Sequence, residues 1–561
     1  MTSEASLSES NGGGGGRPPR KEPSLSPPAY ILNRHNGRVL DPTSAVVAPN
    51  QPVPRPTVYV GGQLLIRDGD LAAVEPFLAR PMAKLNVLAR AIPVDRQLYD
   101  LAREHKLVEL ADRVLIHRLV LTPVGEDASL PPDAWTFLQE YRAQFRDPKD
   151  PLITKLTLEH LLSGTEIGGN PFMQGGPFMQ GGPFMQGGPF MQGGPFMQGG
   201  PFMQGGSVVA QYGLPGTGGR APVTWLGAPP NRCEDPDLTT RRPVVAIFDT
   251  GAGEHPWLGE QPVGPVDRSP DVLGLPLGLT DPLTFPDQTG KLNNPLIQDL
   301  DSDAGHGTFI AGIIRQVCPD ADILAVRVMY SDGVVAEGDL LQAVNRLLFR
   351  QVLARTMHKP EWLVDVLSMS LGYYHESPSD VAFDQLLLAP LQELGRLGVA
   401  VVASAGNDST PRHLYPAGFY PNAEGPVFHP APDIISVSSV GAYNPDGKSV
   451  ALFSNAGDWV TCYRLGVSVV STMPVTFNAS LQPTIKLNVD GQERASIDMD
   501  DYRGGFATWS GTSFSAPVLA GQIAQSLISL GQLDAPDIAT AVSSGQAALE
   551  AALELDRPTP P

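Results

Sequence analysis

The chain has 561 residues, an apolar content of 42% and a formal net charge of -20, from 39 Lys and Arg against 59 Asp and Glu. Such an acidic chain is repelled by nucleic acid and by anionic membrane surfaces, so neither is expected as a partner. Its three cysteines, Cys233, Cys318 and Cys462, lie far apart, which argues against a disulfide framework or a metal-ligand cluster and favours a reducing compartment.

The N-terminal residues do not resemble a secretory signal. Residues 1–16, "MTSEASLSESNGGGGG", contain neither a basic segment nor an apolar one. No apolar run in the chain approaches the roughly 18 residues of a membrane span. The sequence therefore predicts cytoplasmic residence, and it makes no prediction about the oligomeric state.

The first predicted units are a disordered segment and a small domain. Residues 1–56 are rich in Gly, Pro and Ser with little to bury, which predicts disorder. From residue 57 to about 165, β-like runs such as "TVYVGGQLLI" are mixed with amphipathic stretches such as "RQLYDLAREHKLVELADRVL". This pattern predicts a small α+β domain, and it carries no motif that points to chemistry.

A tandem repeat follows, within a predicted linker over residues 166–220. Residues 171–206 are six copies of the hexapeptide "PFMQGG". Pro lacks an amide donor and Gly costs backbone entropy, so each copy interrupts helix and strand alike. We predict a flexible tether with an end-to-end distance of roughly 30–36 Å. Two alternatives are a segment that an adjacent site binds and a docking motif for a partner, both of which would depend on copy number.

The last predicted unit, residues 221–555, has the texture of an α/β domain. Apolar runs such as "RPVVAIFD", "ADILAVRVM" and "GVAVVASAGN" alternate with helical stretches such as "GDLLQAVNRLLFRQVLAR". Near-continuous apolar strands are buried on both faces, which is typical of a parallel sheet covered by helices. We predict a doubly wound α/β fold, in which an active site lies at the carboxyl ends of the strands.

Three residues with chemical potential stand at strand ends or helix starts of this domain. Asp249 ends "VVAIFD", His306 begins the helical run in "GHGTFIAGII", and Ser513 lies in "GTSFSAPVLAG". Each alone has a structural explanation as a cap or turn residue. Together they supply a nucleophile, a base that takes its proton, and a carboxylate that fixes the tautomer of the base.

In the order Asp, His, Ser, the stretches "DTG", "GHGT" and "GTSFSAP" resemble the three signature motifs of the subtilisin-like serine proteases, the subtilases. The resemblance covers about residues 240–550. "HPWL" (255–258) is similar to the element that follows the catalytic Asp in this family. "SMSLG" (368–372) resembles the substrate-binding strand, and "ASAGN" (403–407) resembles the segment that ends in the oxyanion-hole asparagine.

The resemblance implies peptide-bond hydrolysis through an acyl-enzyme, with Ser513 as nucleophile, His306 as general base and acid, and Asp249 as its orienting partner. It implies that Asn407 donates to the oxyanion. An extended protein or peptide substrate would bind by strand addition. The substrate-binding residues that it implies are Ser370, Leu371, Gly372, Ser404, Ala405 and Gly406.

The sequence also departs from the family pattern. Phe514 stands where the family commonly has Met, and inserts near 475–505 and 408–432 leave the pocket preference undefined. No cofactor and no metal ligand are predicted. The string Asp299, Asp301, Asp303 has carboxylates that suit calcium, but it lacks the rest of a calcium loop, so a solvated or capping loop is expected.

Two alternatives stay open at this stage. The chain is either an active endopeptidase or a catalytically silent subtilase fold that binds extended peptides, although no member of the triad is missing. The N-terminal domain is either an inhibitory or chaperoning pro-domain, or a domain that recruits a client protein.

Overall fold

The computed structural model describes residues 25, 27–49, 51–125, 131–147, 149–164, 212, 219–234, 240–259, 264–282, 285–291, 296–377, 385–419, 433–531, 533–535 and 537–555. The six hexapeptides, and most of the predicted linker over 166–220, lie outside the described residues.

The larger domain is built on a seven-stranded sheet in which every neighbouring pair is parallel. The strand order is β17-β16-β15-β13-β7-β11-β8. The bounds are β7 Val244–Asp249, β8 Val266–Asp267, β11 Asp322–Arg327, β13 Val366–Met369, β15 Ala400–Ser404, β16 Ser438–Tyr443 and β17 Cys462–Leu465. The strands that follow β7 lie on both sides of it, with β11 and β8 on one side and the later strands on the other, as in a doubly wound fold.

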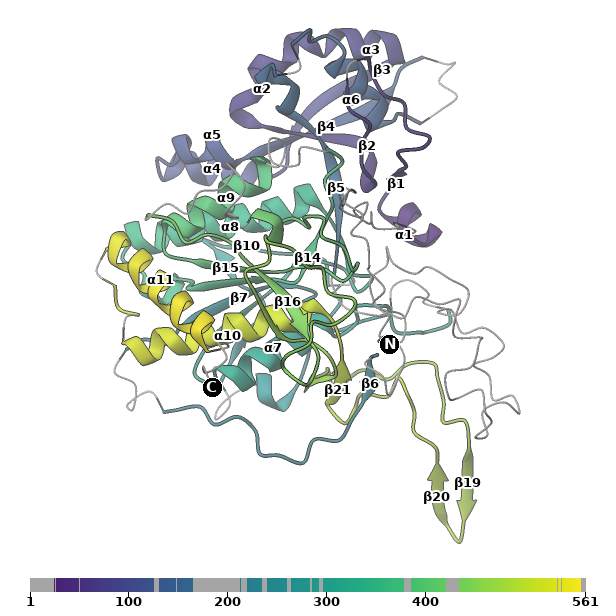
Figure 1. The fold of residues 1–561 in the computed structure, drawn as a ribbon, viewed down its shortest axis with the longest axis vertical. Helices are drawn as coiled ribbons and strands as arrows, with labels where there is room; N and C mark the ends of the chain where they lie inside the picture. The colour runs from purple at the N-terminus through teal and green to yellow at the C-terminus, as the bar shows by residue number, and fades with distance from the viewer. Residues whose placement is uncertain are drawn as a thin grey trace, which may run out of the picture.

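Helices cover both faces of this sheet (Figure 1). Along β7, Val245 and Ile247 belong to the apolar cluster of one face, and Ala246 and Phe248 to the cluster of the other. The first cluster includes α7 (His306–Val317), α10 (Thr512–Leu530) and α11 (Ile538–Glu554). The second includes α8 (Glu337–Thr356) and α9 (Gln385–Arg396). The predicted doubly wound α/β fold is therefore confirmed.

The N-terminal domain is an antiparallel sheet with helices, an α+β arrangement. Strand β2 lies between β4 and β5, β3 continues the sheet beyond β4, and β1 also pairs with β2. The strands are β1 Gly37–Leu40, β2 Thr57–Arg67, β3 Val87–Pro93, β4 Ile116–Pro123 and β5 Leu156–Gly164. The helices are α1 Ala29–Arg34, α2 Asp68–Val74, α3 Ala79–Leu85, α4 Arg96–Glu104, α5 Val108–Val114 and α6 Ala134–Arg142.

The structure differs from the sequence-based prediction at the start of this domain. Composition predicts disorder over residues 1–56, yet α1 and β1 lie inside that segment. Strand β1 is held by pairing with β2, and the side chain of Ile31 is fully buried in an apolar cluster with Val58 and Val60. A partner strand supplies the order that a Gly- and Pro-rich composition does not predict.

The two domains share both a sheet and a core. Strand β5 pairs antiparallel with β12 (Val334–Ala336) and with β14 (Leu371–Gly372), both from the larger domain. Leu98 and Leu110 of the N-terminal domain belong to the same apolar cluster as Leu341 and Leu348 of α8. In Figure 1 the N-terminal domain, in purple and blue, sits against α8 and α9.

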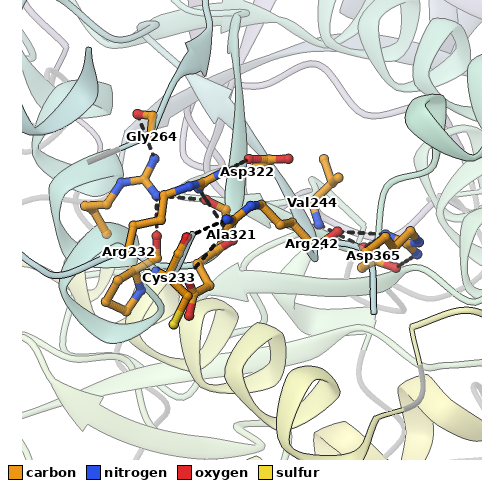
Figure 2. A network of polar contacts seen from close by, with 12 residues as sticks. Arg232, Cys233, Arg242, Val244, Gly264, Ala321, Asp322 and Asp365 are labelled. Atoms are coloured by element: carbon orange, nitrogen blue, oxygen red, sulfur yellow. Dashed lines mark hydrogen bonds and ion pairs between the residues drawn. The ribbon is translucent and has the colours of Figure 1, made fainter. Parts of the chain in front are cut away.

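The segment that leads into β7 is fixed by ion pairs at the amino ends of the central strands (Figure 2). Arg241 makes two hydrogen bonds to Asp365, of 2.7 and 2.6 Å, and Asp365 also accepts from the backbone N of Val244. Arg232 pairs with Asp322, the first residue of β11, at 2.5 Å. These contacts lie at the opposite end of β7 from Asp249, so they secure the strand without touching its carboxyl end.

The remaining elements are short. The predicted insert near 475–505 contains an exposed hairpin, which projects from the domain in Figure 1. Among the described residues, no helix has the length and apolarity that a membrane crossing requires. The bounds are β6 Ala221–Pro222, β9 Asp271–Val272, β10 Leu275–Pro276, β18 Val469–Thr472, β19 Lys486–Val489, β20 Gln492–Ala495 and β21 Phe506–Trp509. The 3-10 helices are η1 Glu75–Phe77, η2 Pro151–Thr154, η8 Pro256–Leu258, η10 Pro360–Trp362 and η12 Ala417–Phe419.

Replacing Phe137 tests whether the N-terminal domain has its own core. Its α6 side chain is fully buried in a cluster with Leu64 and Leu119. Phe137→Ala should lower the free energy of unfolding of this domain by about 3–5 kcal/mol, because the substitution leaves a cavity. Amide hydrogen exchange in β2 and β4 should accelerate accordingly. Leu88→Ala, at a β3 side chain that is 53% exposed, is the control and should change stability by less than about 0.5 kcal/mol.

Candidate active site

Asp249 ends the central strand β7, at the carboxyl edge of the parallel sheet. Its side chain is fully buried, and Oδ1 accepts a hydrogen bond of 2.7 Å from the backbone N of Thr250. Gly251 follows with φ +86°, a conformation that favours glycine, and turns the chain away from the sheet. The turn fixes the carboxylate in place at the strand end.

His306 is the first residue of α7, and its Nδ1 lies 2.8 and 2.9 Å from the two carboxylate oxygens of Asp249. The next residue has to be glycine, since a Cβ on Gly307 would lie 2.2 Å from the carbonyl oxygen of Gly251. The backbone N of Gly307 also donates to Thr250 Oγ1 at 3.0 Å. The motifs "DTG" and "GHGT" thus pack directly against each other, which explains why small residues flank the Asp and the His.

This pairing changes the protonation chemistry of His306. Burial alone would lower the pKa of the imidazole, but the charge of Asp249 and the hydrogen bond to it raise the pKa above its ordinary value of 6.5. A carboxylate at Nδ1 keeps the proton on that nitrogen, so Nε2 is the nitrogen that exchanges protons with a reacting group.

Ser513 is the second residue of α10 and is also fully buried. Its neighbour Phe514 has its ring centroid 5.3 Å from that of His306, and the Trp509 ring, which also contacts Phe514, lies 5.6 Å from the same imidazole. The structure therefore brings the start of α10 against the start of α7. The predicted trio Asp249, His306 and Ser513 meets at one edge of the sheet.

Asn407 follows strand β15 and is tied to the same helix start. Its Oδ1 accepts a hydrogen bond of 3.0 Å from the backbone N of Thr512, which leaves the NH2 end of the amide as the donor. Gly406, with φ +99°, donates its backbone N to Thr512 Oγ1 at 3.1 Å. Ser404, Ala405 and Gly406 are all buried, and the backbone N of Ala405 donates to Val440.

The predicted substrate-binding strand is present as β14 and the residue before it. Ser370 Oγ donates to the backbone carbonyl of Ser513 at 2.9 Å, which joins this segment to the start of α10. Leu371 and Gly372 form the ladder with Gly164 and Ser163 of β5. The edge where an extended substrate is expected is therefore already paired, with a strand of the N-terminal domain.

The acidic string before His306 lies in a loop that is largely buried. Asp301 accepts from the hydroxyl of Ser331, and Asp299 accepts from the hydroxyl of Ser480. Asp303 is fully buried and accepts a hydrogen bond of 3.0 Å from the backbone N of His306 through its carbonyl. Asp299 and Asp301 thus bond to serines of other segments, and the cap residue of α7 is Gly305, which has no side chain to accept a bond.

Arg220 and Trp509 are site residues that the sequence reasoning missed. Arg220 Nη1 donates to the carbonyls of Ser302 and Ala304, at 3.1 and 2.7 Å, and its guanidinium lies 4.9 Å from the centroid of the Trp509 ring. Both thus support the segment that leads into His306. No local pattern marks Arg220, since the carbonyls that it bonds are 81 to 84 residues away.

Removing the carboxylate of Asp249 tests the origin of the raised pKa of His306. In Asp249→Asn the pKa of His306 should fall, because burial then acts without the compensating charge. Titration of the imidazole by NMR in the full chain measures the change. Asp41→Asn, at an exposed turn, is the control and should leave the titration of His306 where it is. An unchanged pKa in Asp249→Asn would contradict the assignment of Asp249 as the cause.

The comparisons with known proteins agree with this geometry. The model of the subtilase family, Peptidase_S8, matches residues 240–544. An intracellular serine protease of Paenibacillus polymyxa is 26% identical over 294 residues, which are 50% of this chain and 65% of that protein. Serine protease AprX of Bacillus subtilis (strain 168) is 23% identical over 307 residues, which are 51% of this chain and 56% of that protein.

Two solved structures are also similar to this chain. A cold adapted subtilisin-like serine proteinase has a TM-score of 0.30 and 21% identity, covering 52% of this chain and 77% of its own. Fervidolysin from Fervidobacterium pennivorans has a TM-score of 0.41 and 16% identity, covering 87% of this chain and 57% of its own. The match to the two serine proteases spans less than two thirds of their length. The family match spans more than half of the chain, and the chain belongs to the subtilase family.

Proposed function

We propose that the chain is a serine endopeptidase that hydrolyses peptide bonds of extended protein segments through an acyl-enzyme. The observation that carries the proposal is the Asp249–His306 pair at the carboxyl edge of the sheet, next to Ser513 at the start of α10. The family match adds the reaction class.

In the proposed reaction the Ser513 hydroxyl attacks the scissile carbonyl while His306 Nε2 takes its proton. The resulting imidazolium is stabilised by Asp249, and its proton passes to the leaving amine as the peptide bond breaks. Water then attacks the ester, with His306 again taking a proton and returning it to Ser513. The Asn407 amide and the backbone N of Ser513 donate to the oxyanion in both halves of the reaction.

We further propose that the N-terminal domain inhibits this activity as a pro-domain. Its strand β5 pairs with β14, the strand on which a substrate would add, and with β12 opposite. Ser513, His306 and Asp249 are all fully buried in this arrangement, so the nucleophile is closed to a protein substrate. Recruitment of a client is less well supported, because a recruiting domain would leave β14 open. The hexapeptide tract would then serve as the tether, and cytoplasmic residence remains a prediction.

Ser513→Ala should abolish hydrolysis of an unfolded protein, because the nucleophile is gone, and Asn407→Ala should reduce turnover by about 10²–10³. Turnover is measured with the full chain after its N-terminal domain is detached by cleavage of the tract. Ser529→Ala, at an exposed serine near the end of the same helix, is the matched control and should keep full activity. Full activity in Ser513→Ala would overturn the triad, whereas no activity in any form would favour the silent peptide-binding scaffold.

Labelling of Ser513 with a peptidyl phosphonate tests the inhibition. In the intact chain labelling should be slow, because β5 fills the edge that the reagent must pair with. After an introduced protease site in the tract is cut and the sample diluted, the rate should rise by about 10² or more, because the tethered domain loses its effective concentration. Equal rates before and after cutting would contradict inhibition and favour recruitment.

A further inference from the structure

Strand β5 occupies the cleft in the manner expected of a bound peptide. It lies between β12 and β14, with Ser163 opposite Val334 on one side and Gly372 on the other. The backbone N of Gly164 also donates to Gly333 at 2.9 Å. Because the ladder ends beside the segment that contacts Ser513, each residue of β5 marks the place of a substrate residue on the N-terminal side of the scissile bond.

One side chain of this strand, His160, lies in a buried pocket formed by residues of the larger domain. Its Nδ1 lies 2.8 Å from a carboxylate oxygen of Glu337, and its Nε2 lies 2.9 Å from a carboxylate oxygen of Glu376. The imidazole stacks on Tyr373 with centroids 4.4 Å apart and the ring planes at 22°. His160, Glu337, Glu376 and Tyr373 are all buried.

The two carboxylates come from opposite walls of the cleft. Glu337 begins α8 directly after β12, and Glu376 follows β14 by four residues. The pocket is therefore tied to the two strands that pair with β5. Leu162 lies on the same face of β5 as His160 and belongs to the same apolar cluster as Leu371 and Tyr373. This face of the strand is therefore the one that packs against the larger domain.

The pocket is built for a cation. Both ring nitrogens of His160 face carboxylate oxygens, so both must carry protons to donate. Burial alone would lower the pKa of His160, but the hydrogen bonds to Glu337 and Glu376 raise it to about 10. Arg142 of α6 adds a second cation, 3.5 Å from Glu376. Both cations belong to the N-terminal domain, and both carboxylates belong to the larger one.

A metal ion is the other occupant that this pocket suggests. Donor atoms of His160, His375 and Glu376 lie within 4.8 Å of one another. However, both nitrogens of His160 already bond to carboxylates, and Nδ1 of His375 accepts from the backbone N of Ser377 at 2.9 Å. The geometry is that of an ion-paired imidazolium, so a cationic side chain is favoured over a metal.

The same charge pattern continues along the cleft. Asp332 pairs with Arg34 and His35, at 3.2 and 3.0 Å, and Asp339 pairs with Arg118 at 2.8 Å. In each pair the acid comes from the larger domain and the base from the N-terminal domain. When that domain leaves, the carboxylates around the cleft lose these cations together.

We infer that Glu337 and Glu376 form a substrate subsite that selects a Lys, Arg or protonated His four residues before the residue that pairs with Leu371. This inference rests on the proposed function and adds a substrate class to it, extended segments with a basic residue at that position. Charge-assisted hydrogen bonds in a desolvated pocket discriminate strongly, since a neutral or acidic side chain leaves two buried carboxylates without the cation that bonds to both.

Matched peptides test the subsite. They carry the sequence of residues 156–168 with Lys, Ala or Glu in place of His160, and the enzyme is the full chain after cleavage of the tract. The N-terminal domain competes equally with all of them, so the ratio of kcat/KM values is unaffected by it. The Lys peptide should exceed the Ala peptide by about tenfold or more, and the Glu peptide should be the poorest.

Two variants and one additive complete the test. Glu337→Gln with Glu376→Gln should bring the ratio of the Lys and Ala peptides close to one, because a pocket without charge no longer favours a cation. Glu493→Gln, on the exposed hairpin, is the matched control and should keep the preference. A chelator should change nothing, and a preference that disappears with it would overturn the cation subsite in favour of a metal.

Binding of the same peptides to Ser513→Ala, measured by fluorescence anisotropy, separates the two hypotheses. A preference for Lys in binding without any cleavage by the parent chain would overturn the proposed activity and leave the subsite standing. Cleavage of all peptides at equal rates would overturn the subsite and leave the activity standing.

Discussion

The buried pair of Asp249 and His306 is the interaction on which the rest of the site depends. Moving a carboxylate and an imidazole out of water is costly, and such a pair persists only with close geometry and further hydrogen bonds. Both conditions are met where Gly307, which has no Cβ, lets α7 approach the turn after β7, and where the backbone N of Thr250 donates to the carboxylate. Helix α10 packs on α7 and begins beside it, which places Ser513 in turn.

The second constraint is that the backbone groups at the facing edges of two short strands need hydrogen-bond partners. Strands β12 and β14 leave between them a gap one strand wide, whose backbone groups need a partner. Strand β5 satisfies both edges, and backbone pairing of this kind carries affinity without regard to sequence. Selectivity must then come from side-chain pockets along the strand, and the carboxylate pair around His160 is a pocket of this kind.

Much of this arrangement follows from the sequence. Apolar runs predict the parallel sheet. Its topology explains why Asp249, His306 and Ser513 lie at one edge, since β7 ends there and α7 and α10 begin there. The pairing of β5 with β12 and β14 was not predictable in this way. The contacts of His160 with its two glutamates, for example, join residues 177 and 216 apart, and no periodicity within one segment records such a distance. The order of α1 and β1 was missed for the same reason, because it depends on β2.

The net charge of -20 also conceals how the charges are distributed. As a sum it argues only against nucleic acid and anionic membranes as partners, yet around the cleft acidic residues of one domain pair with basic residues of the other, as Asp332 pairs with Arg34 and Asp339 with Arg118. In the proposed function, the acidic residues that hold the N-terminal domain in place are the same ones that a substrate must pair with. If the hexapeptide tract is a tether, as proposed, it keeps the effective concentration of β5 high, and cutting it removes this advantage. A basic substrate can then take its place, because it supplies the same cation to the same two carboxylates.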